Sequence, residues 1–395
     1  MDALPAAATA TAAANEVMDD LSGRSAASPP PLTLPLPHDD LLLEILLRLP
    51  PEPIHLLRAS LVSKHWRRLI HDARFLRRFR AFHGVPPVLG FLNNQPGPPL
   101  FHYVRPLLHD VPSHDSWWAL ECRHGLALLQ HRSSGNLLVW HLMSGEQRCL
   151  PRPQPALDCY DCRPGFNAAV LRAAGNEDRL DCRSCPFLVA VALTHGGHAD
   201  LTSACVYSSE TGVWGDVISV ATLEEVEARP TALVGNTLYW PMTAGCILEF
   251  DVDKYSLDVP NDMFCYYEGL IVLMPAEHGG LGFAAVDGLS LHLFSRVATT
   301  DGTLVWTLCR AIDLNKFLTP DVVVSCKTFS MEAIGVAEGA DVVFIYACKC
   351  AYMLHLKSMQ FDEVSVKGTY ASIFPYTSFY TPVLPCLLSS RNDKV

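Results

Sequence analysis

The stretch LPHDDLLLEILLRLPPEPIHLLRASLVSKHWRRLI, residues 36–70, has a helical pattern that the rest of the chain lacks. Pro37 lies before a predicted helix of about three turns, and Pro50 and Pro51 end it, because proline interrupts the interior of a helix. The apolar residues of this helix are Leu41, Leu42, Leu43, Ile45, Leu46, Leu47 and Leu49. They cover nearly its whole circumference, which predicts that the helix is buried on more than one side.

Two further amphipathic segments follow that helix. Residues 56–79 place apolar side chains three to four positions apart, with Arg and Lys between them, which predicts an amphipathic helix. A third, short helix is predicted around Arg74 to Arg80. About fifty residues of short helices rarely form a stable core on their own. The surplus apolar surface therefore predicts a partner protein.

Charge is unevenly distributed along the 395-residue chain, whose net charge is −11. Residues 33–83 hold nine Lys and Arg against five Asp and Glu, so this segment carries +4 and the remainder −15. A nucleic-acid binder is usually basic over its whole binding domain. The pattern therefore favours an acidic protein as the partner of the helical segment, and no nucleic acid.

Composition limits the class of protein further. Apolar residues make up 49% of the chain, yet no stretch approaches the roughly 18 uninterrupted apolar residues of a membrane span. The acidic N-terminal stretch of residues 1–20 differs from a secretory signal, and the 14 Cys are then expected as reduced thiols. We therefore expect a protein of the cytoplasm, the nucleus or both, with no membrane association.

From Val88 onward the helical pattern gives way to short apolar strands separated by turn residues. A unit of strand, turn and strand recurs in LLVWHLMSGEQRCLP, CVYSSETGVWGDV, CILEFDVDKYSLDV, LHLFSRVATTDGTLVW and YMLHLKSMQFDEVSV. Two of the four steps between these units are 42 and 44 residues, which is the length of a propeller blade, and the steps of 68 and 61 residues require insertions. The pattern predicts a β-propeller of six or seven blades, and a pair of packed sheets is the alternative.

These patterns divide the chain into four segments. Residues 1–32 are rich in Ala, Ser and Pro and have few large side chains, which predicts a disordered tail. A helical domain over residues 33–83 and a large β domain over residues 84–385 follow, and residues 386–395 are expected to be a flexible C-terminus. The predicted fold class is α+β multidomain, with a small N-terminal helical domain and an all-β domain that forms an irregular β-propeller.

The helical segment resembles an F-box. Its Leu-Pro start, the helix pattern D-x-L-L-x-E-I-L-x-R-L-P and the ending V-S-K-x-W-R-x-L-I agree with that family in order and spacing. The resemblance implies docking on a Skp-family adaptor, an acidic protein that joins the F-box to a cullin-RING ubiquitin ligase. The adaptor-facing positions that it implies are Leu36, Pro37, Leu41, Ile45, Leu49, Val62 and Trp66. The alternative for some of these side chains is that they only complete a small helical core.

The β region resembles the F-box-associated β domain of a large plant family that is common in grasses. The stretches that carry the resemblance are VLGF, VYSSETGVWG, GNTLYW, LEFDVDKYSL, LGFAAVDGLSLHLFSR and SFYTP. Together the two resemblances imply a substrate-recognition subunit of an SCF-type ubiquitin ligase, in which the β domain captures a protein substrate and other subunits supply the chemistry. Such a subunit is not itself an enzyme. The alternative is a propeller that binds a small ligand or acts as an enzyme, with the F-box as a localising handle.

Four cysteines form two C-x-x-C pairs, Cys159 with Cys162 and Cys182 with Cys185, and 19 residues separate the pairs. This spacing suits a tetrahedral zinc site. Each pair, however, precedes a predicted strand, at 166–173 and at 186–193, so in an antiparallel hairpin the pairs lie about 25 Å apart. Two interpretations therefore stay open. The four cysteines are unligated thiols, or residues 174–185 fold back and bring them together in a zinc site.

Motifs for nucleotide, metal-protease or serine-hydrolase chemistry are absent from the sequence. We therefore expect no cofactor and no catalytic residue.

Overall fold

The computed structural model describes residues 38–94, 101–104, 116–153, 165–173, 186–195, 201–260, 271–326, 331–364 and 372–380. The chain divides into two compact units, Met1–Leu41 and Leu42–Val395, and the second contains every strand named below. The predicted tail at residues 1–32 and the predicted flexible C-terminus at 386–395 lie outside the described residues.

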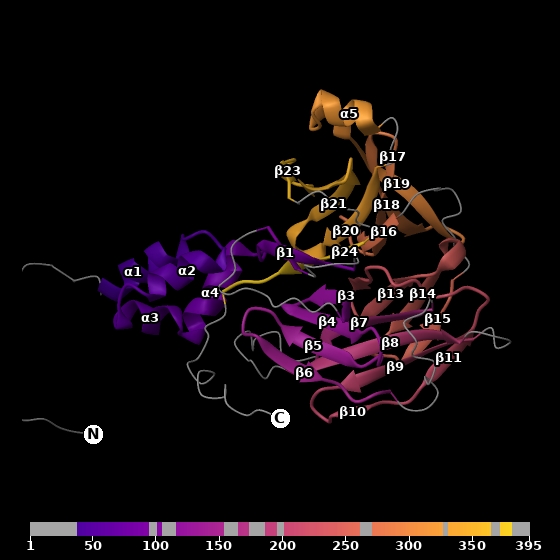
Figure 1. Cartoon of the computed structure of the whole chain (residues 1–395), viewed down its shortest axis with the longest axis horizontal. Helices are drawn as coiled ribbons and strands as arrows, with labels where there is room; N and C mark the ends of the chain where they lie inside the picture. The colour runs from indigo at the N-terminus through magenta and orange to yellow at the C-terminus, as the bar shows by residue number, and fades with distance from the viewer. Residues whose placement is uncertain are drawn as a thin grey trace, which may run out of the picture. The chain divides into compact units, whose positions relative to one another are not determined.

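Four short helices form the helical region (Figure 1). They are α1 (His38–Leu47), α2 (Pro53–Ser60), α3 (Lys64–Ile70) and α4 (Ala73–His83). The amphipathic helix predicted over residues 56–79 is wrong, because the chain breaks between α2 and α3. Ser63 caps α3 there: its side-chain oxygen accepts a hydrogen bond from the Trp66 backbone N–H at 3.1 Å, and a serine in this role favours a helix start over a helix interior.

The helical region has its own core, and part of it comes from the far end of the chain. The buried residues of this core are Leu46, Leu47, Leu56, Ala59, Ile70, Phe75, Leu76, Phe79 and Tyr380. The Tyr380 hydroxyl lies 3.2 Å from Nε2 of His71, and the Phe379 ring lies edge-on to that of Phe79. Within the chain itself α1 is buried on one side only, because Ile45 is 53% exposed while Leu46 is 1% exposed. Burial of a second side therefore stays a prediction that needs a partner.

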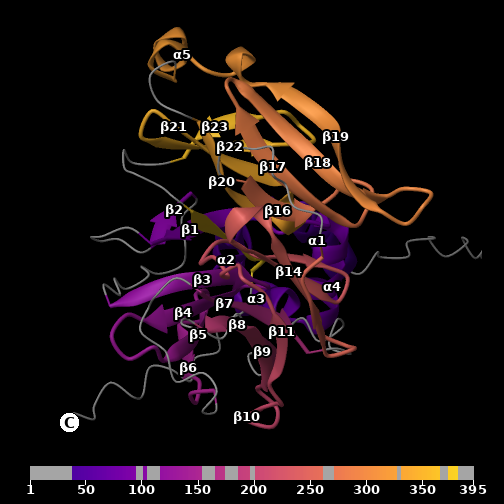
Figure 2. The same cartoon turned by 90° about the vertical axis from the view of Figure 1, so that its right-hand side faces the viewer.

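Six antiparallel sheets are found among the described residues (Figures 1 and 2). Four of them are β3 (Trp117–Arg123), β4 (Leu126–His131), β5 (Leu137–His141) and β6 (Glu146–Cys149); β12 (Ala232–Val234), β13 (Thr237–Pro241), β14 (Ile247–Asp251) and β15 (Ser256–Asp258); β16 (Ile271–Pro275), β17 (Leu281–Asp287), β18 (Ser290–Ala298) and β19 (Leu304–Asp313); and β20 (Glu332–Ala337), β21 (Val342–Ala347), β22 (Cys350–His355) and β23 (Phe361–Glu363).

The other two sheets depart from this four-stranded plan. The first contains β7 (Phe166–Arg172), β8 (Phe187–His195), β9 (Leu201–Ser208) and β10 (Val213–Trp214), with β11 (Ile218–Ala221) also paired to β9. The second contains β2 (Phe101–Tyr103), β1 (Val88–Asn93) and β24 (Ile373–Thr377). Short helices η2 (Thr243–Gly245), η3 (Leu314–Lys316), η4 (Glu338–Ala340) and α5 (Pro320–Cys326) lie between strands.

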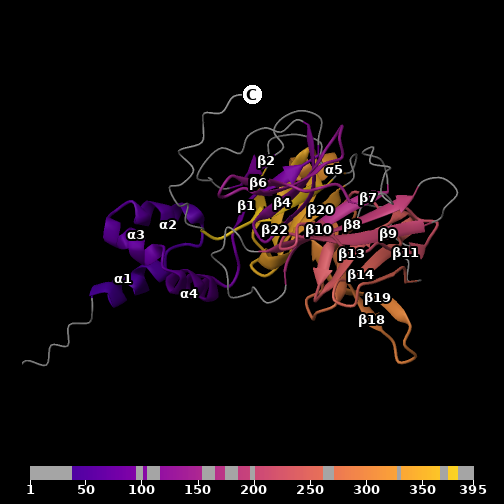
Figure 3. The same cartoon turned by 90° about the horizontal axis from the view of Figure 1, so that it is seen from below.

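The sheets are the blades of a six-bladed β-propeller. Their first strands contact one another around a ring, β24 with β3, β3 with β7, β12 with β16, β16 with β20, and β20 with β24, and Figure 3 shows the blades from a further side. The pairing of β1 with β24 closes the ring, and the backbones of β20 and β24 approach closely: a Cβ on Gly335 would lie 2.8 Å from the Ile373 carbonyl oxygen. The predicted propeller is confirmed with six blades, and the alternative of two packed sheets is wrong.

The recurring unit of the sequence corresponds to the third and fourth strands of a blade. The five quoted stretches fall on β5 and β6, β9 and β10, β14 and β15, β18 and β19, and β22 and β23. The 61-residue step contains η3 and α5, so the insertion required there is partly helical. The predicted strands at 166–173 and 186–193 are found as the antiparallel pair β7 and β8.

The last blade joins distant parts of the chain. Strand β1, which follows the helical region, pairs with β24, so that Phe91 lies opposite Pro375. A closed ring leaves no unpaired sheet edge at the junction of its ends. Among the described helices, none is long and apolar enough to cross a membrane.

Candidate functional site

The helical region exposes large apolar side chains, although it also has a buried core. The apolar residues that are more than half exposed in this region are Leu41, Ile45, Leu61, Val62 and Phe82. Single exposed apolar residues are common on protein surfaces, but several within one short segment mark an interaction surface. This segment therefore has an unusual apolar surface.

Basic side chains accompany these apolar residues. The exposed ones are Arg48, Arg58, Lys64, Arg67, Arg68, Arg74, Arg77 and Arg78. Arg48 and Arg78 both pair with Glu44, at 2.7 Å in the case of Arg48. Six of these basic side chains remain without an ion pair to a described residue, so the helical region presents positive charge to solvent.

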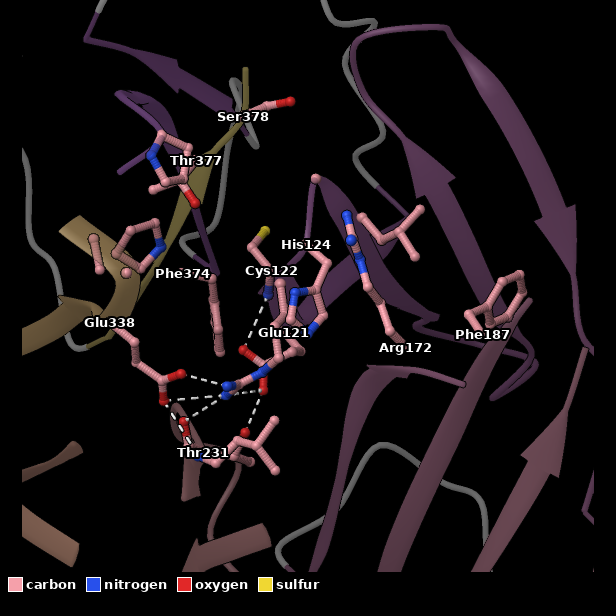
Figure 4. Close-up of a pocket in the computed structure, with 18 of the residues that line it drawn as sticks. Glu121, Cys122, His124, Arg172, Phe187, Thr231, Glu338, Phe374, Thr377 and Ser378 are labelled. Atoms are coloured by element: carbon pink, nitrogen blue, oxygen red, sulfur yellow. Dashed lines mark hydrogen bonds and ion pairs between the residues drawn. The ribbon is translucent and has the colours of Figure 1, made fainter. Parts of the chain in front are cut away.

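A second unusual feature lies in the propeller channel, where three alternate blades are joined by buried charges. Arg123, at the end of β3, pairs with Glu338 in η4 and lies 3.4 Å from Glu121 of its own strand. Arg123 also donates to the Thr231 carbonyl at 3.3 Å, and the Thr231 hydroxyl donates to Glu121. Figure 4 shows Glu121, Thr231 and Glu338 pointing toward one another. We call Glu121, Arg123, Thr231 and Glu338 the channel network.

The charges of the channel network are largely shielded from solvent. The side chains of Arg123 and Glu121 are only 8% and 6% exposed. Burial disfavours the charge of Arg123, but the attraction of Glu338 and Glu121 outweighs burial and raises the pKa of Arg123. Burial raises the pKa of Glu338, against the attraction of Arg123. Such a network fixes the geometry of a site and is poorly suited to exchanging protons with a substrate.

A bulge in β3 helps to place the network. The pairing of β3 with β4 shifts between Ala119 and Glu121, which leaves Leu120 without a partner in the ladder. A bulge of this kind redirects the side chains next to it. A carboxylate in the middle of a strand, in WWALECR (residues 117–123), was the signal by which the sequence could have indicated this network.

The channel network lines a cavity with a volume of about 1060 Å³. Arg172, His124 and Phe187 also line this channel cavity, together with Phe374 of the closing blade (Figure 4). Among the described residues, no group of three His, Cys, Asp or Glu side chains is placed to hold a metal ion. The cavity thus offers charged and apolar walls to a ligand.

Two family models match the chain. Residues 36–78 match the F-box domain, and residues 119–384 match the model described as F-box protein AT5G49610-like, beta-propeller. The second match covers more than half of the 395 residues. The chain belongs to this family. A comparison with curated proteins finds no match.

Three solved structures illustrate what the chain is similar to. A structural genomics protein of unknown function from Bacteroides thetaiotaomicron is 12% identical, with a TM-score of 0.36, and the match covers 68% of this chain and 63% of that one. The WD40 domain of SCAP from fission yeast is 11% identical, with a TM-score of 0.33 and coverage of 65% and 57%. A chain of the mitotic checkpoint complex is 10% identical, with a TM-score of 0.34 and coverage of 63% and 64%. The chain thus spans less than two thirds of the length of each.

Within the F-box, the predicted adaptor-facing residues fall into three groups. Leu41, Ile45 and Val62 are exposed. Leu49 and Trp66 are half-buried and pack against the helical core. Leu36 and Pro37 lie outside the described residues. The sequence interpretation did not include Leu61, which is 64% exposed and precedes Val62 in the turn after α2.

The two C-x-x-C pairs also lie outside the described residues. Cys159 and Cys162 fall in the gap at 154–164, and Cys182 and Cys185 in the gap at 174–185. The zinc site and the four unligated thiols therefore both stay predictions.

Proposed function

We propose that this protein is the substrate-recognition subunit of an SCF-type cullin-RING ubiquitin ligase. The F-box docks a Skp-family adaptor, which connects it to a cullin, and the propeller recruits a protein substrate. The membership of the chain in a family of F-box propeller proteins supports a substrate-receptor role in general. The more specific statement, that this F-box binds the adaptor, is carried by the apolar and basic surface of its helices.

The adaptor-binding surface that we propose is centred on Ile45, Leu61 and Val62. Each of these side chains is more than half exposed, so each has surface to bury against a partner. The six basic residues without an ion pair then favour an acidic adaptor and accelerate its association. Trp66 acts mainly from behind this surface, because it packs against the helical core.

The role that we propose for the propeller is to position a protein substrate. A receptor holds its substrate near the ubiquitin-transfer subunits, and proximity alone accelerates such a reaction. Families of this kind are generally non-catalytic adaptors, and we propose the same for this chain. We also propose that the protein comes from a grass and that it is located in the cytoplasm, the nucleus or both. The channel cavity favours, as a second function, the binding of a small ligand.

The experiment that tests adaptor docking is co-purification of the full chain with a Skp-family adaptor. Ile45→Asp and Val62→Asp each place a charge on the proposed surface without opening a cavity in the core. Because a side chain at the centre of an interface contributes about 2 kcal/mol or more, we expect each variant to lose at least about thirtyfold in adaptor affinity. Titration calorimetry with the purified adaptor measures this loss.

The matched control is Val297→Asp, which introduces the same charge at a propeller valine that is 46% exposed. This variant should bind the adaptor like the unmodified chain, and all three variants should unfold at the same temperature. Unchanged adaptor affinity in both Ile45→Asp and Val62→Asp would contradict the docking proposal. Trp66→Ala, or Ala at Leu36 and Pro37 together, is a less sharp test, because Trp66 also packs against the helical core.

A further inference from the structure

Four arginines line the channel cavity, Arg80, Arg123, Arg148 and Arg172, and two of them differ in their partners. The Arg123 guanidinium is held by two carboxylates, Glu121 and Glu338. Arg172, at the end of β7, lines the same cavity and makes no hydrogen bond or ion pair to any residue that the structure describes. Arg123 is therefore paired with carboxylates that the structure describes, whereas Arg172 lines the cavity without such a partner among the described residues.

A histidine next to Arg172 is held in an uncommon backbone conformation. His124 and Gly125 form the turn between β3 and β4, with φ of 56° and 77°. The Tyr376 hydroxyl fixes this turn by donating to the Gly125 carbonyl at 2.9 Å. Two consecutive positive φ values are those of a two-residue type I′ hairpin turn, so the hairpin accounts for this conformation and fixes where His124 lies.

The same histidine is kept neutral. Desolvation in the channel and the neighbouring charges of Arg123 and Arg172 lower the pKa of His124, although this residue keeps an exposed surface. A neutral imidazole has one N–H donor and one acceptor. Figure 4 shows His124 lying beside Arg172 in the cavity. The pair therefore offers one full positive charge and one neutral hydrogen-bond donor.

Apolar walls adjoin this polar pair. Phe187 lies opposite Arg172 in the ladder of β7 and β8, and the Arg148 guanidinium stacks on its ring at 5.5 Å. Leu126 and Phe374 also line the cavity. Small-molecule sites typically combine apolar walls with a few directed polar groups in a volume of about 300 to 1,000 Å³.

We propose that the channel cavity binds a small aromatic or aliphatic monocarboxylic acid. Its carboxylate pairs with the guanidinium of Arg172 and accepts a hydrogen bond from His124, and its apolar body lies against Phe187. The proposal is independent of adaptor docking, because none of these residues belongs to the F-box surface.

Local charge favours a monoanion beside Arg172. The cavity is lined by four arginines, Arg80, Arg123, Arg148 and Arg172, and by four glutamates, Glu121, Glu146, Glu210 and Glu338, so the formal charge of its lining is balanced. One negative charge on the ligand is matched by Arg172, whereas a dianion such as hydrogen phosphate adds a second charge close to Glu121 and Glu338. A planar carboxylate also fits a guanidinium through two parallel hydrogen bonds.

The experiment measures the unfolding temperature of the full chain with benzoate or cinnamate, and in parallel with benzamide, cinnamamide and inorganic phosphate. A ligand that binds only the folded chain raises this temperature with increasing concentration. We expect both carboxylates to raise it and the two amides, which lack the charge, to leave it unchanged. Arg172→Met should weaken carboxylate binding at least about tenfold, because a charge-assisted pair is lost.

The matched control is Arg152→Met, which removes an exposed arginine that does not line the cavity. This variant should respond to benzoate like the unmodified chain. Three results would overturn the proposal: no response of the unmodified chain to either carboxylate, a response that persists in Arg172→Met, or an equal response to phosphate. Adaptor binding by Arg172→Met should be unchanged, so failure of this proposal is separable from failure of the proposed function.

Discussion

The F-box and the propeller depart in opposite directions from the usual distribution of side chains, in which apolar residues are buried and charged residues are exposed. The F-box exposes large apolar side chains such as Ile45, Leu61 and Val62. The propeller buries charged ones, Glu121 and Arg123, and joins them to Glu338 in its channel. Apolar residues usually lie inside a protein, and charged residues are rarely fully buried unless they are paired.

The buried charges and the exposed apolar side chains have different explanations, because only the buried charges find partners within the described chain. The channel charges are paired with one another across three blades. The exposed F-box side chains are not covered by any described part of the chain. We therefore expect the buried charges to serve the fold and the exposed apolar side chains to serve the proposed binding of a partner. Four substitutions test this distinction.

The largest effect is expected for Arg123→Met. This substitution leaves Glu121 and Glu338 buried without their cation, and breaking a buried ion pair in this way costs about 3–5 kcal/mol. Denaturant unfolding should show this loss in the free energy of unfolding of the propeller. A loss below about 1 kcal/mol would mean that water reaches the channel charges and that the pairing contributes little.

The next largest effect is expected for Tyr380→Ala. Tyr380 is 2% exposed and belongs to the core of the F-box helices, and truncation of a buried aromatic residue costs about 3 kcal/mol or more. Hydrogen exchange should localise the loss to α2, α3 and α4. Tyr380→Phe, which removes only the hydroxyl near His71, should cost about 1 kcal/mol. Loss of protection in the propeller alone would contradict the placement of Tyr380.

A smaller effect is expected for Leu61→Ala, and it concerns binding. Leu61 is 64% exposed, so its truncation should change the free energy of unfolding by less than about 0.5 kcal/mol. Its affinity for a Skp-family adaptor should fall about fivefold, which corresponds to about 1 kcal/mol. The paired variant Leu56→Ala, at a fully buried leucine of α2, should instead lose stability. An equal loss of stability in both variants would remove the contrast between surface and core.

The smallest effect is expected for Arg172→Met without ligand. Because Arg172 has no ion pair with a described residue, its removal should change the free energy of unfolding by about 0.5 kcal/mol or less. The difference between the free energies of unfolding of Arg172→Met and Arg123→Met, two variants at the same cavity, then measures what the pairing with Glu121 and Glu338 contributes. Destabilisation as large as that of Arg123→Met would mean that both cations are structural.

The sequence allowed much of the fold to be predicted, because the deciding signals are local. Pro37, Pro50 and the apolar residues between them mark the first F-box helix, and the spacing of the strand pairs indicates propeller blades. The break before Ser63 was missed, since the apolar spacing continues across it. Local periodicity does not register a capping side chain that stops a helix.

The channel network and the channel cavity could not be predicted from the sequence. Arg123 and Glu338 are 215 positions apart, and Thr231 is 108 positions from Arg123. Their meeting depends on the blade order and on the bulge at Leu120, which no local pattern encodes. Tyr380 was missed for the same reason, because its partners in the F-box core lie about three hundred positions earlier in the chain.

The pairing of β1 with β24 has a consequence for how the protein is made. During synthesis the F-box helices and β1 precede all other described elements. Strand β1 cannot pair with β24 until almost the whole chain has been synthesised. A product cut short before Ile373 lacks the strand that shuts the ring and also the tyrosine that completes the helical core. Such a fragment exposes open sheet edges and has a weakened F-box core at the same time, so it is prone to aggregate before the fold is complete.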